Sequence, residues 1–157
     1  EVEHNDDVIF KPLFSYEMVG ICSKDHPLAE KEIWDAEDFA NETWVTYTVP
    51  DDMLDLLRKV LKPKGINPTR RTTELTIAMI QLVASRRGIA TIPYWAALPY
   101  LEKGYVVARK VTKEGLYSNL YAAIRKEDES LSYLEDFYQT VKAQSFSTLP
   151  GLSVLDL

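Results

Sequence analysis

The stretch QLVASRRGIATIPYW, Gln81 to Trp95, joins a helical pattern to a strand pattern and decides the fold class. Its first residues continue an apolar run from Glu74 to Arg87, and a helix this apolar is expected to be buried on more than one side. Gly88 stands at the position after a helix where a residue in the left-handed backbone conformation is favoured, so we expect the helix to stop there. GIATIP then lacks polar alternation, which is typical of a central parallel strand.

Helix and strand patterns alternate on both sides of this stretch. Strand patterns occupy VIFKPLF, YEMVGICS, TWVTYTV, the end of NPTRRTTEL, YVVARKV and LYAAIRK. Helical patterns occupy DAEDFA, YWAALPYLEKG and SYLEDFYQTVKAQ, the last of which could pack in the core or contact a second subunit. The alternation predicts an α/β fold with a mainly parallel, doubly wound sheet.

A further helix is predicted after Pro50. Asp51 is placed to cap it, and Pro63 and Gly65 end it. Its apolar side chains fall at helical spacing and predict one buried stripe, formed by Met53, Leu54, Leu57, Val60 and Leu61.

Composition narrows the class of protein. The chain has 157 residues, 46% of them apolar, which allows a hydrophobic core without covalent cross-links. Its net charge of −6 gives no general basic surface for nucleic acid. A single cysteine, Cys22, excludes an internal disulfide and is expected to be a small core residue. No apolar run approaches the roughly 20 residues of a membrane span.

Polar and aromatic residues follow the ends of three predicted strands. In a doubly wound sheet, ligands bind outside the carboxyl ends of the strands. A helix start there offers amides for a carboxylate, an acidic side chain suits an ammonium, and aromatic rings suit an apolar arm. This combination fits a zwitterionic amino acid. The candidate ligand-binding residues are Tyr47, Thr48, Val49, Thr73, Glu74, Pro93 and Tyr94.

Each of these residues also has a purely structural explanation. The threonines could be helix caps, Tyr47 could be strand surface, and Trp95 could be core. Paired acids such as Asp51 and Asp52 stand at a predicted helix start, where capping accounts for them. The chain has no GxGxxG, phosphate-loop or GxSxG motif, and its two histidines are too few for a metal site without carboxylates. We therefore predict no catalytic residues, no metal and no cofactor.

The same segments resemble the effector-binding domain of LysR-type transcriptional regulators. LVASRRGIA followed by IP resembles the family's helix, glycine and strand closing in proline. The family's other landmarks are similar to PLFSYEMVGICSKDHPLAEK, WDAEDFANETWVTYTV, LKPKGINPTRRTTELTIAMIQ and LYAAIRKEDESLSYLEDFYQTV, in that order. The resemblance covers nearly the whole chain.

The resemblance implies a fold of two α/β lobes like that of type 2 periplasmic binding proteins, with an effector cleft between them. Residues 16–114 would form a largely complete, Rossmann-like lobe II. Residues 1–15 and 115–157 would form part of lobe I, and the winged helix-turn-helix that precedes the family's effector domain is absent from this chain.

The resemblance also implies a function that is not enzymatic. The most similar members respond to homocysteine and control methionine biosynthesis genes, so homocysteine or a similar amino acid is the expected effector. DNA would be bound through the absent N-terminal domain, in a cytoplasmic homo-oligomer, a dimer or tetramer, with no membrane partner. The first alternative is a periplasmic-type binding protein for an amino acid. The second, ranked below it, is a small α/β enzyme.

Overall fold

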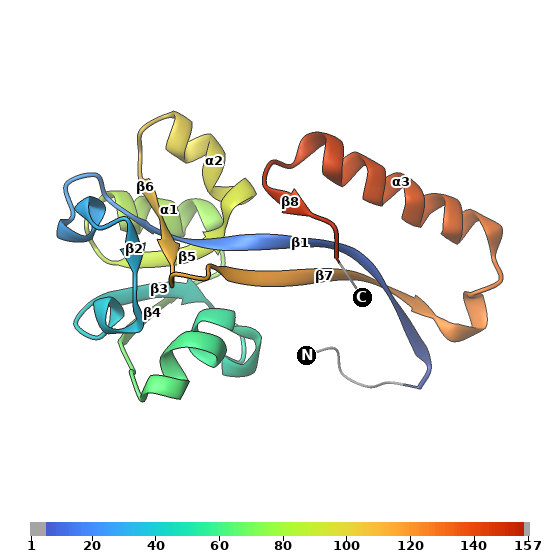
Figure 1. The fold of residues 1–157 in the computed structure, drawn as a ribbon, viewed down its shortest axis with the longest axis horizontal. Helices are drawn as coiled ribbons and strands as arrows, with labels where there is room; N and C mark the ends of the chain where they lie inside the picture. The colour runs from blue at the N-terminus through green and yellow to red at the C-terminus, as the bar shows by residue number, and fades with distance from the viewer. Residues whose placement is uncertain (1–5, 156–157) are drawn as a thin grey trace. The chain divides into compact units, whose positions relative to one another are not determined.

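The computed structural model describes residues 6–155, which divide into two compact units. The larger unit comprises Glu17–Leu116, and the smaller comprises the chain up to Tyr16 together with the chain from Tyr117 onward. One long strand, β1 (Val8–Cys22), contributes residues to both units (Figure 1). The sequence predicted two strands here, VIFKPLF and YEMVGICS, but β1 continues through Ser15 and joins them.

The larger unit is built on a mixed sheet with the strand order β2-β6-β1-β5-β3-β4. The other strands are β2 (Ile33–Trp34), β3 (Thr43–Tyr47), β4 (Thr69–Thr73), β5 (Ile89–Pro93) and β6 (Val107–Val111). β1 runs antiparallel to β5 and β6, whereas β2 with β6, and β3 with both β4 and β5, are parallel pairs. The predicted α/β class is confirmed, but the sheet is mixed rather than mainly parallel, because β1 runs antiparallel to its neighbours β5 and β6.

Both faces of this sheet are covered, because neighbouring residues of a strand point to opposite sides. On one side, α1 (Thr76–Ala84) and α2 (Tyr94–Glu102) pack on a cluster that includes Val45 and Ala90. On the other side, the cluster includes Trp44 and Ile89. Figure 1 shows the two groups of helices on either side of the strands. Cys22 is fully buried in the second cluster, so its predicted core position is confirmed.

Short helices build that second side. They are the 3-10 helices Pro27–Glu30, Ala36–Phe39, Asp51–Met53 and Lys62–Lys64, and the π-helix Leu56–Leu61. The single regular helix predicted after Pro50 is therefore wrong. The backbone is extended at Leu54, which breaks the helical phase, so that Met53 is 68% exposed and Leu56 is buried. Pro50, not Asp51, is the residue that precedes the 3-10 helix Asp51–Met53, and the Asp51 carboxylate pairs with Arg70.

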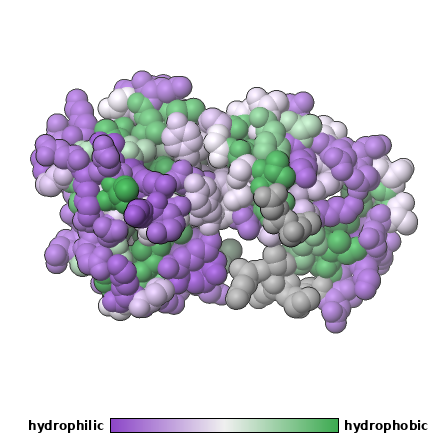
Figure 2. All heavy atoms as spheres, in the orientation of Figure 1, coloured by the Kyte–Doolittle hydropathy of each residue, from purple (hydrophilic) through white to green (hydrophobic). Residues whose placement is uncertain are grey.

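The smaller unit packs one long helix against strands. It contains the first part of β1, β7 (Leu116–Arg125, of which Leu116 belongs to the larger unit), the 3-10 helix Lys126–Asp128, α3 (Ser132–Thr148) and β8 (Leu152–Ser153). β7 and β8 both pair with β1. Its core is formed by Leu13, Phe14 and Tyr138. α3 has a second apolar face, since Tyr133 and Phe137 are 63% and 66% exposed. Figure 2 shows hydrophobic side chains between hydrophilic ones on the face in view.

None of the helices described combines the length and hydropathy that crossing a bilayer requires.

Candidate functional site

Three parallel strands of the larger unit end at the same edge of the sheet. β3 and β4 are in register from Thr43 beside Thr69 to Tyr47 beside Thr73, the last residue of each strand. β5 lies on the other side of β3, with Ala90 beside Val45. The carboxyl ends of adjacent parallel strands share an edge, so the seven candidate residues lie along it. We call them the strand-end rim: Tyr47, Thr48, Val49, Thr73, Glu74, Pro93 and Tyr94.

The strand-end rim combines accessible polar groups with half-buried rings. Thr48, Val49 and Glu74 are exposed, whereas Tyr47, Thr73, Pro93 and Tyr94 are half-buried. The two exposed polar side chains and the exposed valine are thus available to a ligand in solution. The half-buried rings have fixed surroundings, since Tyr47 and Tyr94 pack against the apolar cluster beneath α1 and α2.

The turn from β4 into α1 presents backbone amides beside the strand-end rim. The residue before α1 is Leu75, whose side chain cannot accept a hydrogen bond, and the Thr73 hydroxyl accepts one from the Leu75 amide at 3.4 Å. The first backbone hydrogen bond of α1 runs from the Met79 amide to the Leu75 carbonyl. The amides before Met79 in the first turn thus have no acceptor within the helix, which favours an anionic group there.

Sequence reasoning missed one residue at this turn. The Thr76 side-chain oxygen lies 2.7 Å from the Tyr47 hydroxyl, which links the last residue of β3 to the first residue of α1. A threonine that opens a helix directly beyond a strand end is the signal that could have indicated it. Trp95, by contrast, follows Tyr94 into α2 and is half-buried.

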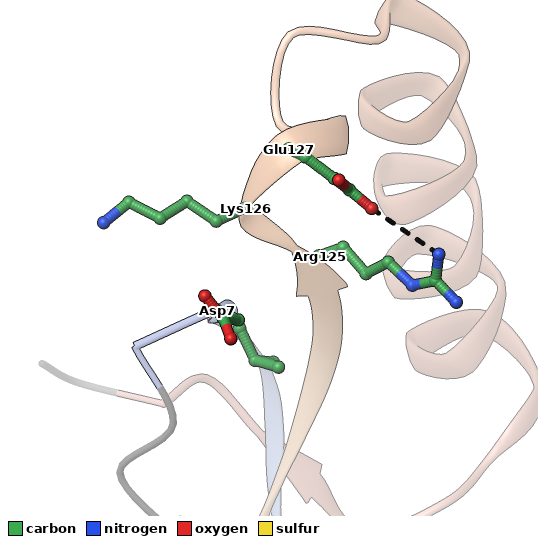
Figure 3. Close-up of a pocket in the computed structure, with 5 residues that line it drawn as sticks. Asp7, Arg125, Lys126 and Glu127 are labelled. Atoms are coloured by element: carbon green, nitrogen blue, oxygen red, sulfur yellow. Dashed lines mark ion pairs between the residues drawn. The ribbon is translucent and has the colours of Figure 1, made fainter.

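Two hollows on the surface of the described residues are lined by residues other than those of the strand-end rim. One, of about 440 Å³, lies in the smaller unit between Asp7, Val8 and residues 125–127 (Figure 3). There the Arg125 guanidinium points toward Glu127 and lies 3.6 Å from its carboxylate. The other, of about 380 Å³, lies in the larger unit, and Asp35, Lys59, Lys64 and Lys113 are among its lining residues.

The contacts of the histidine and the cysteine of the larger unit, His26 and Cys22, are those of residues that support the fold. His26 precedes a 3-10 helix, and its Nδ1 accepts a hydrogen bond from the Leu28 amide at 3.2 Å. Its Nε2 lies 3.3 Å from Glu42. Burial raises the pKa of the Cys22 thiol from 9.0 to about 11, which keeps it protonated. Among residues 6–155, no three histidine, cysteine or acidic side chains gather as a metal site would require.

Comparison with known proteins identifies the family. The family model described as the LysR substrate binding domain matches residues 1–145. The chain is 92% identical over 157 residues to the HTH-type transcriptional regulator MetR of Haemophilus influenzae, covering 100% of this chain and 51% of that protein. It therefore spans about half the length of the curated relatives it matches.

Comparison with solved structures supports the same family. The regulatory domain of MetR, a LysR family regulator from N. meningitidis, has 62% sequence identity and a TM-score of 0.94, covering 99% of this chain and 72% of that one. The effector binding domain of QuiR in complex with shikimate has 22% identity and a TM-score of 0.73, covering 92% of this chain and 68% of that one, and supports the fold alone. The curated relatives are transcriptional regulators, not enzymes. This chain belongs to the LysR substrate-binding domain family.

Proposed function

We propose that this chain is the ligand-sensing domain of a transcriptional regulator that responds to homocysteine or a similar amino acid and controls methionine biosynthesis genes. The observation that carries the proposal is the register of β3 with β4, which sets Tyr47 beside Thr73 at the shared carboxyl edge of three parallel strands. The relatives at 92% and 62% identity are both named MetR, which supports the choice of effector class.

The chemistry of the strand-end rim suits a zwitterion with a short apolar arm. The carboxylate would bind the first amides of α1 and the hydroxyls of Thr73 and Thr48. Glu74 would bind the ammonium through a charge-assisted hydrogen bond. Val49, Pro93 and Tyr94 would contact the arm, since apolar walls favour a thiol or thioether over a hydroxyl.

Sensing requires no bond to be made or broken. A ligand shifts a conformational equilibrium only by its differential affinity for the two states. In this proposal residues 16–114 act as lobe II and carry the strand-end rim, and residues 1–15 and 115–157 belong to lobe I. A DNA-binding region outside this chain would read the shift, in a cytoplasmic homo-oligomer.

Calorimetric titration of homocysteine into a full-length protein that carries this chain tests the proposal. We expect saturable binding that Glu74→Ala and Thr73→Ala each weaken by about tenfold, the size of one charge-assisted or one well-placed hydrogen bond. Thr69→Ala is the matched control for Thr73, because Thr69 is exposed at the other end of β4. Glu102→Ala at the end of α2 is the control for Glu74.

Two results would count against the proposal. Equal affinity of the parent, Glu74→Ala and Thr73→Ala would remove the strand-end rim as the site. Binding of no amino acid by the full-length protein would remove the effector class.

A further inference from the structure

One hydrogen bond ties the strand-end rim to α1. The Tyr47 and Thr76 hydroxyls lie 2.7 Å apart in a partly buried position, although 29 residues separate them in the chain. Tyr47 ends β3, and Thr76 opens α1. The phenol of Tyr47 therefore crosses from the strand end to the helix start at the level where a ligand carboxylate would meet the first amides of α1.

The position of Thr76 in its helix explains why its hydroxyl is available to a tyrosine. Hydroxyls inside a helix commonly bond to the carbonyl four residues earlier. In α3 this is what happens, with Thr140 bonded to the Asp136 carbonyl at 2.8 Å and Thr148 to the Gln144 carbonyl at 2.7 Å. Thr76 is the first residue of α1, and the residue four positions before it lies in β4, so the helix offers its hydroxyl no such acceptor.

The surroundings of Tyr47 restrict where its hydroxyl can go. The ring is half-buried and packs against the apolar cluster beneath α1, and its hydroxyl lies at the start of that helix, beside Thr76. A phenol can donate and accept, and so can a threonine hydroxyl. When the hydrogen bond with Thr76 uses one of the two capacities of the Tyr47 hydroxyl, the other remains for a ligand.

We propose that Thr76 is a positioning residue for the effector site, which acts by holding the Tyr47 phenol in place to receive the polar end of an amino-acid ligand. This inference rests on the function proposed above. Thr76 itself need not contact the ligand. Loss of its hydroxyl would leave the Tyr47 O–H free to rotate about its C–O bond, and the ligand would then have to order it on binding.

Four variants of the full-length protein, titrated with homocysteine, test the inference. Thr76→Val keeps the shape of the side chain and removes the hydroxyl, and should raise Kd by about 2- to 10-fold, the range of one net hydrogen bond. Thr76→Ser keeps the hydroxyl and should restore affinity to within about twofold of the parent. Tyr47→Phe should weaken binding at least as much as Thr76→Val.

The double variant Tyr47→Phe/Thr76→Val separates positioning from a merely structural effect. If Thr76 acts through Tyr47, the double variant binds no more weakly than Tyr47→Phe alone. Thr140→Val in α3 is the control for removing a threonine hydroxyl, and should leave Kd unchanged. Additive losses in the double variant would show that Thr76 acts independently of Tyr47 and would overturn the inference.

The outcomes distinguish this inference from the proposed function. If the parent binds homocysteine and Thr76→Val binds equally well, the inference fails and the proposed function stands, even if Thr76→Val lowers the melting temperature. If the parent binds another amino acid instead, the same four variants are titrated with that ligand. If the parent binds no amino acid at all, both fail.

Discussion

A Cβ atom on Gly88 would lie 2.4 Å from the carbonyl oxygen of Thr43, the first residue of β3. Gly88 also has φ +156°, which L side chains rarely adopt. The chain needs glycine here because β5 must begin beside the backbone of β3. Gly88→Ala should therefore lower the free energy of unfolding by about 3–5 kcal/mol, from the clash and the strain together.

Gly104→Ala is the matched control for this prediction, measured by urea denaturation. Gly104 has φ +68°, but nothing lies within 4 Å of its added Cβ. Its cost should be only the backbone strain, about 1–2 kcal/mol. Equal losses for the two variants would contradict the close approach of Gly88 to Thr43.

The smaller unit depends on a contact between α3 and β1. The Tyr138 hydroxyl donates a hydrogen bond of 2.6 Å to the Pro12 carbonyl, and Tyr138 is only 8% exposed. Tyr138→Phe leaves that carbonyl without this donor and should cost about 1–2 kcal/mol in thermal unfolding. Tyr133→Phe, on the exposed face of the same helix, should change stability by less than about 0.5 kcal/mol. A neutral Tyr138→Phe variant would contradict this role.

The Cys22 thiol should be unreactive in the folded protein. Burial raises its pKa from 9.0 to about 11, and the thiolate is the reactive form. A maleimide should therefore label Cys22 only after the protein is unfolded in urea. Because the folded pKa is the higher one, this thiol's contribution to stability is present below pH 9.0 and is lost as the pH rises to about 11. Rapid labelling under native conditions would contradict its burial.

Asp51 should titrate at low pH because of Arg70. The hydrogen bond from the Arg70 guanidinium, with its charge and that of Lys62, lowers the pKa of the Asp51 carboxyl below its ordinary 3.8. The folded pKa is the lower one, so this pairing stabilises the fold above pH 3.8 and is lost as the pH falls through the folded value. Arg70→Gln should raise the pKa of Asp51 toward 3.8 in an NMR titration of the carboxyl carbon. A larger rise for Lys62→Gln would show that Lys62 is the main partner.

The strands around the strand-end rim could be predicted because their signals are local. TWVTY and IATIP carry the β-branched and apolar residues of strands, and β3 and β5 lie there. Parallel strands in a doubly wound sheet must end on one side, which brings Tyr47 and Thr73 to a shared edge. That these residues bind a ligand stays a prediction.

The end and the burial of α1 were predicted wrongly, because both depend on neighbours distant in sequence. The helix ends at Ala84, and Arg86 rather than Gly88 takes the left-handed conformation, with φ 60°. Gly88 is required by β3, not by the helix. An apolar composition also cannot show which faces of a helix the rest of the protein covers. Here Leu75 and Ile77 are 63% and 49% exposed.

The side-chain links could not be predicted either. The bond between Tyr47 and Thr76 spans 29 residues, and the bond between Tyr138 and Pro12 spans 126. No local pattern encodes such pairs, because they form only after the strands and helices have packed.

Amide chemical-shift mapping would locate bound homocysteine residue by residue. A full-length protein carrying this chain would be isotopically labelled and titrated with homocysteine, with homoserine as the control that replaces the thiol by a hydroxyl. We expect the largest shifts at residues 47–49, 73–76 and 93–94, with weaker binding of homoserine. Largest shifts in the hollow between Asp7 and residues 125–127, or in the hollow between Asp35 and Lys64, would contradict it.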